Sequence, residues 1–499
     1  MVTKIVVLVI YISILFLIGY RASKRIKNMS DYYVGGKKLG FWAVAFSARA
    51  TGESGWLLIG LTGMGAIAGY SAYWVVLGEL LGVAVSWFFM AKRFKRRSDK
   101  YKSITIPDYL ESHFKSTKHT LRILAASVLS IFVIIYVSSQ IDATGIAFES
   151  MLGVNYYAGA LIGFFIVLIY IFFGGFVAAV WSDLFQGLLM FFGLILLPLV
   201  VWFSMDHGTG ITEGLNAIDP ALTSIWGGNP DVWMNVFTIL GFSMIGLGFL
   251  GSPQVYVRFM SIKNEAEIDK GKWVAIAFTL LTDAAAVTIG ILARVLFTQN
   301  GQDAEAILGV GGKDVLAIMT ENFLPYILIA IYIAIVLSAI MSTIDSLLII
   351  ASSAITRDFY QKIFRPDLKD NELTKISRIV TIIIAIFALV IAMIIALVSP
   401  DRQVFWVIIF GWSGIAATFC PVIILSLFWK GYSEMGAIAS MISGFLSVML
   451  VKFVFQELES VGEYFVQLDV LAPSFVVAML FGWVFSKLYP PKNQPENSH

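Results

Sequence analysis

Two charged residues and several small polar ones interrupt an otherwise apolar stretch near residue 50. The run at 47–55 reads Ser-Ala-Arg-Ala-Thr-Gly-Glu-Ser-Gly, so Arg49 and Glu53 lie one helical turn apart. Opposite charges at this spacing pair on one helix face, and an internal ion pair would make both charges tolerable among apolar residues. Alternatively, the planar guanidinium of Arg49 holds the carboxylate of a ligand.

A second interrupted stretch, at 246–253, reads Gly-Leu-Gly-Phe-Leu-Gly-Ser-Pro. Proline removes a backbone donor and glycine weakens a helix, so we expect both this stretch and 47–55 to unwind locally. Unwound backbone at membrane depth is tolerated where it is packed in protein or lines a watery cavity. Glycine and proline are also common in membrane helices, which is the alternative for either stretch alone.

Hydroxyl and carboxylate groups gather in a third apolar stretch, at 338–346, which reads Ser-Ala-Ile-Met-Ser-Thr-Ile-Asp-Ser. Ser342 and Ser346, four residues apart, share one helix face. Such oxygen ligands suit a small hard cation and suit zinc or copper poorly, so sodium is the natural candidate. A membrane hydroxyl can instead bond back to its own helix, but a carboxylate such as Asp345 is functional by default at this depth.

Asp183 is another intramembrane carboxylate, preceded by Trp181 and Ser182. Two interpretations of it stay open. It is either a ligand of a bound cation or an N-terminal cap of the helix that begins there.

The composition shows which kind of molecule must position these residues. Of the 499 residues 58% are hydrophobic and 14% are charged, with a mean hydropathy of +0.83, which is typical of an all-α polytopic membrane protein in one domain. The net charge of +2 argues against a nucleic-acid partner. The single cysteine, Cys420, excludes an internal disulfide framework and a Cys-based metal site.

Thirteen segments are long and apolar enough to cross a bilayer, which takes about 20 residues. In the first, the positive charge at Arg21, Lys24, Arg25 and Lys27 follows the apolar run, whereas a secretory signal has it before the run, so this segment is predicted to be an uncleaved helix. The predicted spans are 3–21, 41–69, 73–92, 120–148, 156–178, 181–203, 232–256, 272–297, 323–356, 377–399, 404–428, 435–455 and 468–488.

The distribution of Lys and Arg predicts the topology, because these residues are retained on the cytoplasmic side. Alternate loops are basic, namely 21–38, 92–118, 258–272 and 357–378. The loop at 206–231 has neither Lys nor Arg, and those at 298–322 and 456–469 hold only Lys313 between them. Thirteen crossings of the cell's inner (plasma) membrane, with the N-terminus outside and the C-terminus inside, fit this pattern.

Several motifs in order along the chain carry a family resemblance. They are Asp31-Tyr32-Tyr33-Val34-Gly35-Gly36, Ser54-Gly55-Trp56-Leu57-Leu58, Thr105-Ile106-Pro107-Asp108-Tyr109, Phe173-Gly174-Gly175-Phe176 with Asp183, Gly251-Ser252-Pro253 with Arg258-Phe259-Met260, and Met341-Ser342-Thr343 leading to Ser352-Ser353-Ala354-Ile355-Thr356. In these motifs the chain resembles the sodium:solute symporters, and within them the sodium/proline symporter branch, over nearly its whole length.

The resemblance implies a LeuT-type core of two inverted five-helix repeats, with one helix before it and two after, which agrees with thirteen crossings. The transport domain would cover 1–489, with an N-terminal helix and inner loop at 1–40, a first repeat at 41–203, a second repeat at 231–428 and two further helices at 435–489. The polar, proline-containing tail 490–499 is expected to be disordered and cytoplasmic.

The resemblance also implies site residues. Sodium would bind the backbone carbonyls near Ala50 and Glu53, the Ala339 carbonyl, and the hydroxyls of Ser342 and Thr343. A possible second sodium would lie near Asp183, Asp345 and Ser346. The solute pocket would draw on Ser54, Gly55, Trp56, Gly60, Tyr136, Gln140, Phe249 and Pro253. Without the resemblance, Trp56 and Tyr136 would be expected to be core aromatics.

The chain departs from the proline carriers at several of these positions. Gly52 stands where they usually have Asp, and Arg49 stands where a small neutral residue is normal. Ile245 and Phe249 replace a favoured Trp and Tyr. These departures make Arg49 a candidate for binding the carboxylate of a different acid or zwitterion.

The expected function is therefore sodium-coupled symport of a small polar solute, most naturally proline or a related amino acid. A sodium symporter for a sugar, sialic acid or another carboxylate is the alternative. An enzyme is not expected, because the histidines all fall outside the predicted spans, at 113, 119, 207 and 499. A channel would need a pore loop or charge rings. The expected partners are the solute, sodium and the lipid bilayer, with no obligate protein partner.

Overall fold

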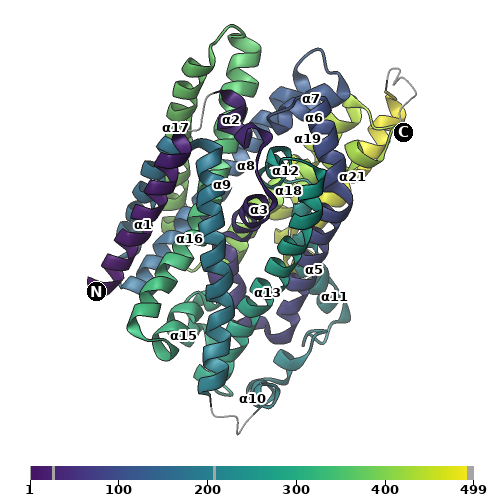
Figure 1. Ribbon diagram of the computed structural model, residues 1–499. Coiled ribbons are helices and arrows are strands. Elements are labelled where there is room, and N and C mark those ends of the chain that lie inside the picture. The colour runs from purple at the N-terminus through teal and green to yellow at the C-terminus, as the bar shows by residue number, and fades with distance from the viewer. Residues whose placement is uncertain (1, 25–27, 206–209, 492–499) are drawn as a thin grey trace.

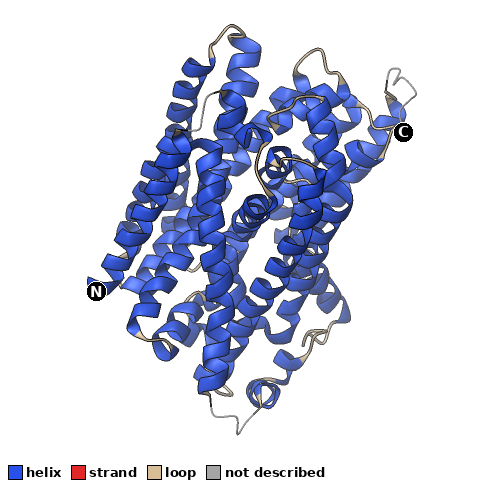
Figure 2. Ribbon diagram, viewed as in Figure 1, coloured by secondary structure: helices blue, strands red, loops and turns tan. Residues whose placement is uncertain are grey.

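The computed structural model describes residues 2–24, 28–205 and 210–491, and within them the chain is almost entirely helical (Figures 1 and 2). These ranges contain no β-strand, although Leu39 and Ile262 form one isolated bridge. For 170–174 and 370–371 only the backbone is described, so the side chain of Phe173 is outside the description. Also outside the described residues are Arg25, Lys27, Asp206, His207 and the tail from 492 onward.

The helices follow one another with short connections. The long ones are α1 (Val2–Ser23), α3 (Phe41–Gly55), α5 (Tyr73–Val85), α8 (Thr120–Leu152), α9 (Tyr156–Ser204), α11 (Val232–Met244), α13 (Glu265–Phe297), α16 (Tyr326–Ser353), α17 (Asp370–Val398), α18 (Val404–Phe428), α19 (Glu434–Phe453) and α21 (Leu471–Leu488). The shorter ones are α2 (Met29–Val34), α4 (Thr62–Ala68), α6 (Ala91–Lys100), α7 (Ile106–Phe114), α10 (Ile211–Ile218), α12 (Pro253–Ser261), α14 (Ala304–Leu308), α15 (Val315–Phe323) and α20 (Gly462–Leu468).

Eleven helical segments of the described chain are long and apolar enough to cross a membrane. One of them, Phe41–Lys100, covers two predicted spans, because Gly69, at a φ of 59°, ends α4 and a short turn leads into α5. The predicted spans 156–178 and 181–203 both fall in α9. The non-helical residue in α9 is Gly175 (φ 55°), so the break comes earlier than predicted.

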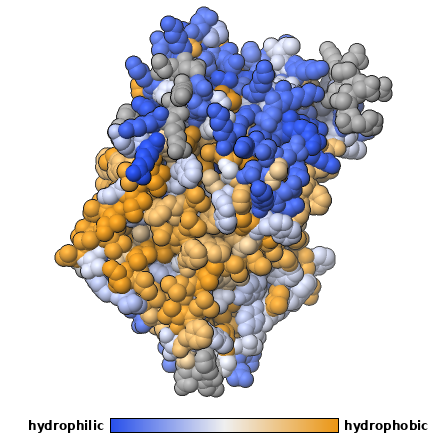
Figure 3. Space-filling view, viewed as in Figure 1, coloured by the Kyte–Doolittle hydropathy of each residue, from blue (hydrophilic) through white to orange (hydrophobic). Residues whose placement is uncertain are grey.

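Helices α16 and α18 lie at the centre of the bundle. In each, 83% of the most apolar stretch is buried within the protein, against 22% in α1. Apolar side chains on α1 and α17 are exposed, among them Val2, Leu397 and Val398. In Figure 3 hydrophilic residues gather at the end of the molecule where Figure 1 places α2, α6 and α7, and apolar residues cover much of the visible face below. This arrangement is that of a protein whose solvent is lipid.

Two helices of the bundle are broken where the sequence predicts interruptions. The chain stays helical from Phe41 to Gly55 except at Ser54, whose φ of 45° is rare for a residue with a side chain. A π-helical stretch, η2 (Trp56–Leu61), continues from there. After α11 the chain tightens into a 3-10 stretch, η6 (Ile245–Leu250), and α12 begins at Pro253. The unwinding in 47–55 is therefore narrower than expected.

Glycines bring α5 and η6 into direct backbone contact. A Cβ atom on Gly246 would lie 1.9 Å from the carbonyl oxygen of Gly78, and one on Gly82 would lie 2.0 Å from that of Gly246. No side chain fits at either position, which is the way membrane helices approach closely. This contact fixes Glu79 of α5 beside the broken helix.

Candidate functional site

Two hydroxyls of α16 bridge to backbone carbonyls of α3 next to its break. Ser342 Oγ donates to the Ala50 carbonyl at 3.0 Å, and Thr343 Oγ1 donates to the Thr51 carbonyl at 3.0 Å. Both hydroxyls also reach the Ala339 carbonyl, at 3.1 and 3.2 Å. The structure thus brings together four of the five predicted sodium ligands.

The fifth predicted ligand, the Glu53 carbonyl, accepts the backbone N–H of Trp56 across the break. The Thr51 carbonyl, which the sequence did not single out, accepts the Thr343 hydroxyl instead. All of these groups are buried oxygens, and hydroxyls and carbonyls are the ligands that a hard cation prefers. The residues present therefore fit a sodium ion.

A buried arginine occupies the neighbourhood of the expected second sodium. Arg258 Nη2 donates to Asp183 Oδ2 at 2.8 Å and also to Ser346, while Nε donates to Ser47 at 2.7 Å. The Ser346 hydroxyl donates to Asp345 at 3.0 Å. The structure rules out one of the two interpretations of Asp183 and the predicted placement of Arg258 in a basic inner loop. Asp183 is not a helix cap but a fully buried residue inside α9, and Arg258 belongs to the protein interior and not to a basic loop.

The predicted solute-binding residues around the break are held by hydrogen bonds. Gly55 N–H donates to Gln140 Oε1 at 3.0 Å, and Tyr136 Oη donates to Ser54 Oγ at 3.4 Å. Trp56 Nε1 donates to the Gly52 carbonyl at 2.9 Å. Gln140 Nε2 is buried without a hydrogen-bond partner, so this group is available to an acceptor on a solute.

Aromatic rings pack around the same place. Phe249 packs against Trp412 with 4.9 Å between ring centroids, and Trp56 meets Phe405 edge to face at 6.2 Å. A Cβ on Gly60 would lie 3.0 Å from Phe405. Pro253 is buried as the first residue of α12. Trp412 and Phe405 lie in an apolar stretch of α18, and no residue pattern distinguished them in the sequence.

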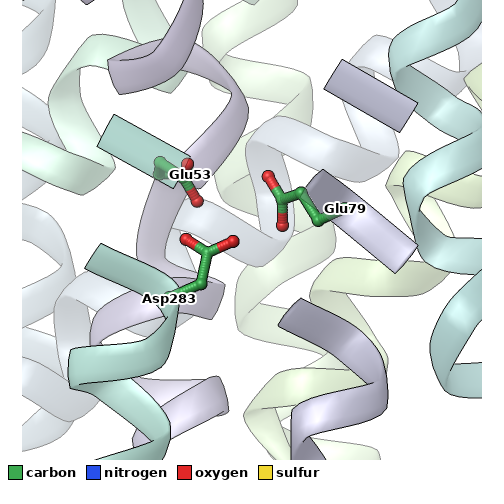
Figure 4. Close-up of side chains that lie close together, drawn as sticks. All are labelled: Glu53, Glu79 and Asp283. Carbon is green, nitrogen blue, oxygen red and sulfur yellow. The ribbon is translucent and has the colours of Figure 1, made fainter. Parts of the chain in front are cut away.

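The charges of α3 belong to a larger cluster, which we call the carboxylate cluster: Arg49, Glu53, Glu79 of α5 and Asp283 of α13. Arg49 Nη2 pairs with Glu53, as the sequence predicts, and also with Glu79 at 2.5 Å. One oxygen from each carboxylate lies within 4.8 Å of the others, and Figure 4 shows the three groups turned toward one another. Arg49 stacks on Phe249 at 4.6 Å, so the cluster adjoins the aromatic wall.

The carboxylate cluster is closed to solvent and incompletely bonded. All four residues are at most 1% exposed. Arg49 Nε and Nη1 and one oxygen of each carboxylate have no hydrogen-bond partner. Glu79 and Asp283 were visible in the sequence as charges in apolar spans, but nothing in the sequence pairs either of them with Arg49.

Comparison with known proteins assigns these features to a family. The family model described as "Sodium:solute symporter family" matches residues 32–444, which is most of the chain. The protein belongs to the sodium:solute symporter family. As a sodium:solute symporter it is a transporter, not an enzyme, and a multi-pass protein of the plasma membrane whose co-transported ion is sodium.

This sodium:solute symporter is similar in sequence to two proline transporters and in fold to a solved symporter structure. It is 35% identical to the high-affinity proline transporter PutP of Bacillus subtilis over 87% of this chain and 89% of the relative. It is 30% identical to the osmoregulated proline transporter OpuE of the same organism over 97% and 94%. A Na+-coupled sialic acid symporter, solved in a substrate-bound outward-open state, shares its fold with a TM-score of 0.77 at 20% identity, over 99% of each chain.

Proposed function

We propose that the protein carries proline or a related amino acid into the cell together with sodium, by alternating access. The observation that carries the proposal is the bridge from the Ser342 and Thr343 hydroxyls to the carbonyls of Ala50 and Thr51 beside a broken helix. Broken helices near the membrane midplane mark ion and solute sites in secondary transporters. The similarity to two proline transporters supports this choice of solute.

The bridge supplies a mechanism for coupling. A sodium ion entering between α16 and α3 accepts the lone pairs of both hydroxyls and both carbonyls, so the hydrogen bonds across the gap give way to ion contacts. The ion then orders the backbone around Ser54, which completes the solute site formed with Gln140 and Tyr136. An inside-negative membrane potential contributes about 2.3 kcal/mol per charge per 100 mV to inward movement.

Arg49 bears on the identity of the solute. Its Nε and Nη1 groups have no partner and its guanidinium lies on the Phe249 ring, so we infer that it takes part in binding the carboxylate of the solute. Proline has such a group. A sugar acid such as sialic acid has one as well, and a symporter for another carboxylate is therefore the second candidate.

The fold extends the proposal to the topology. We propose thirteen crossings, with α1 entering from outside and α21 ending inside, and two inverted repeats at 41–203 and 231–428 within one transport domain. The Phe41–Lys100 segment and α9 each supply two crossings, separated at Gly69 and Gly175. We also infer that the Arg258 guanidinium serves at Asp183 and Ser346 where the sequence suggested a second sodium.

The test is uptake of labelled proline into proteoliposomes that contain the purified protein, with an inward sodium gradient or with potassium in its place. Accumulation that requires sodium supports the proposal. Sodium-dependent thermal stabilisation without proline uptake would retain the ion site and direct the search to other amino acids and to acidic sugars. Equal uptake in sodium and potassium would overturn sodium coupling.

A further inference from the structure

The carboxylate cluster holds more negative charge than its surroundings balance. Glu53, Glu79 and Asp283 supply three carboxylates, and in the described part of the chain Arg49 alone forms ion pairs with the two glutamates, while Asp283 forms none. When all three carboxyl groups are ionised, three negative charges against one positive charge leave two uncompensated. Uncompensated charge buried in protein costs several kcal/mol per ion, so the cluster requires either protons on its carboxyl groups or a further cation.

The protein itself offers Asp283 little compensation. The Thr282 hydroxyl donates to Asp283 Oδ1 at 3.2 Å, and Asp283 Oδ2 has no partner. Glu53 Oε2 and Glu79 Oε2 are likewise unpartnered, and all three side chains are fully buried. Arg49 reaches into the cluster with Nη2 but leaves Nε and Nη1 unpaired, so its own bonding is also unfinished.

The geometry suits a cation of moderate size. Three oxygens no more than 4.8 Å apart share a point at most about 2.8 Å from each. Oxygen ligands surround calcium at about 2.3–2.6 Å, and sodium has nearly the same radius. Figure 4 shows the carboxylates of Glu53, Glu79 and Asp283 directed at such a common point from three different helical elements.

The occupied oxygens argue for one charge and not two. Calcium takes six to eight oxygen ligands, often with both oxygens of a carboxylate, whereas Arg49 Nη2 already holds Oε1 of Glu53 and of Glu79. A singly charged hard ion requires less compensation, and one oxygen of each carboxylate, namely Glu53 Oε2, Glu79 Oε2 and Asp283 Oδ2, has no other partner. One bound sodium ion would reduce the uncompensated charge of the cluster from two negative charges to one.

We propose that Glu53, Glu79 and Asp283 form a second sodium site, separate from the one at Ser342 and Thr343 and from the position held by Arg258. The inference rests on the proposed sodium symport. It gives Arg49 a linking role: a solute carboxylate draws its guanidinium away from Glu53 and Glu79, and the sodium ion balances the charge of the carboxylates that Arg49 then leaves. Solute and second ion therefore bind cooperatively.

The test is equilibrium binding of labelled sodium to the purified protein. The wild type should bind about two ions with a Hill coefficient above one, and the variant with Glu79→Gln and Asp283→Asn should bind about one. Asp469→Asn, which changes a buried carboxylate outside the cluster, should leave the number at about two. Thermal melting checks that each variant folds, and Glu79→Gln alone serves if the double variant does not.

Each other outcome is decisive. If the wild type binds one ion and Ser342→Ala with Thr343→Ala abolishes that binding, the second site is wrong while sodium symport stands. If the wild type binds no sodium, the proposed function itself fails. If micromolar labelled calcium binds to the wild type but not to the Glu79 and Asp283 variants, the cluster is a divalent site and the sodium assignment is overturned.

Discussion

Two arginines lie buried in the same bundle, and their surroundings differ. Every side-chain nitrogen of Arg258 has a partner: Nε bonds to Ser47, Nη1 to the Gln254 carbonyl, and Nη2 to Asp183 and its neighbours. Arg49 bonds through Nη2 alone, and it faces three carboxylates where Arg258 forms one ion pair. Both arginines are at most 1% exposed, so water does not complete either set.

The difference separates a structural cluster from a binding cluster. Buried polar groups that are nearly all bonded hold helices in one arrangement, and Arg258 ties α12 to α3, α9 and α16. Unbonded buried groups are costly unless a ligand arrives. We therefore expect the carboxylate cluster, and not the groups around Arg258, to bind a ligand during transport. The sequence alone made Asp183, which pairs with Arg258, an equally strong candidate.

The largest effect is expected from Arg258→Gln. It leaves Asp183 buried without its cation, which costs about 3–5 kcal/mol, so the yield of folded protein and the melting temperature should fall sharply. Adding Asp183→Asn removes the stranded charge and should restore much of the loss. Thermal melting in detergent measures both. Equal melting of Arg258→Gln and wild type would show that the two arginine clusters do not differ in kind.

The second-largest effect is expected from removing the Ser342 and Thr343 hydroxyls, whose hydrogen bonds to α3 a sodium ion can replace. Ser342→Ala with Thr343→Ala should raise the sodium concentration for half-maximal uptake about tenfold or more, since each 1.4 kcal/mol of lost ligand energy is tenfold. Folding should survive, unlike in Arg258→Gln. The control is Ser338→Ala, one turn earlier on α16, whose hydroxyl bonds to its own helix and to Tyr11 of α1 but not to α3. Unchanged sodium dependence in the double variant would place the ion elsewhere.

Arg49→Gln is expected to lower the affinity for the solute more than it lowers stability, which is the opposite of Arg258→Gln. A charged hydrogen bond is worth about 1.5–3 kcal/mol, so the affinity for a solute with a carboxylate should fall about tenfold to a hundredfold. The loss of stability should be smaller than in Arg258→Gln. Arg49→Lys keeps the charge without the planar fork and should be intermediate. Solute affinity equal to wild type in a folded Arg49→Gln protein would leave Arg49 as an ion-pair residue alone.

The smallest effect is expected from Gly52→Ala. The added methyl group would lie 2.7 Å from Cε1 of Phe249, so the ring must shift, and we expect this to disturb its contact with the Arg49 guanidinium. Loss of this cation–π contact costs about 0.5–2 kcal/mol, and solute affinity should fall several-fold. Gly19→Ala on α1, which meets nothing within 4 Å, is the matched control. Unaltered affinity would separate the carboxylate cluster from the solute site.

How much of this could be predicted depends on how far apart the partners are in sequence. Ser342 and Thr343 are adjacent, and hydroxyls beside Asp345 in an apolar helix are visible without a structure. The breaks at Ser54 and Gly251 follow from local glycine and proline content, and the family from the order of the motifs. The predicted breaks hold because each depends on a short stretch of chain, and the family assignment holds because its motifs keep their order over most of the chain.

The rest depends on tertiary packing. The lysines that follow Arg258 in the sequence led us to predict that it lies in a loop. Its partner Asp183 comes from another helix, and only the fold brings the two together. Glu79 and Asp283 each look like an isolated charge until α5 and α13 meet α3. The Thr51 carbonyl carries no sequence signal, since every residue has one. Ligand roles for the predicted site residues stay predictions until binding is measured.

The glycine contact between α5 and η6 restricts how the protein can move. No side chain lies between Gly78, Gly82 and Gly246, so the two backbones are in direct contact. Separating the two segments would therefore leave an unfilled gap between them. We expect them to travel as one piece, with the bend taken up at Gly251 just beyond. The distance between Glu79 and Phe249 would then be the same in the outward-facing and the inward-facing state. Distances between spin labels on α5 and α11 that stay constant between sodium-bound and sodium-free states would confirm this, and a change of several ångströms would refute it.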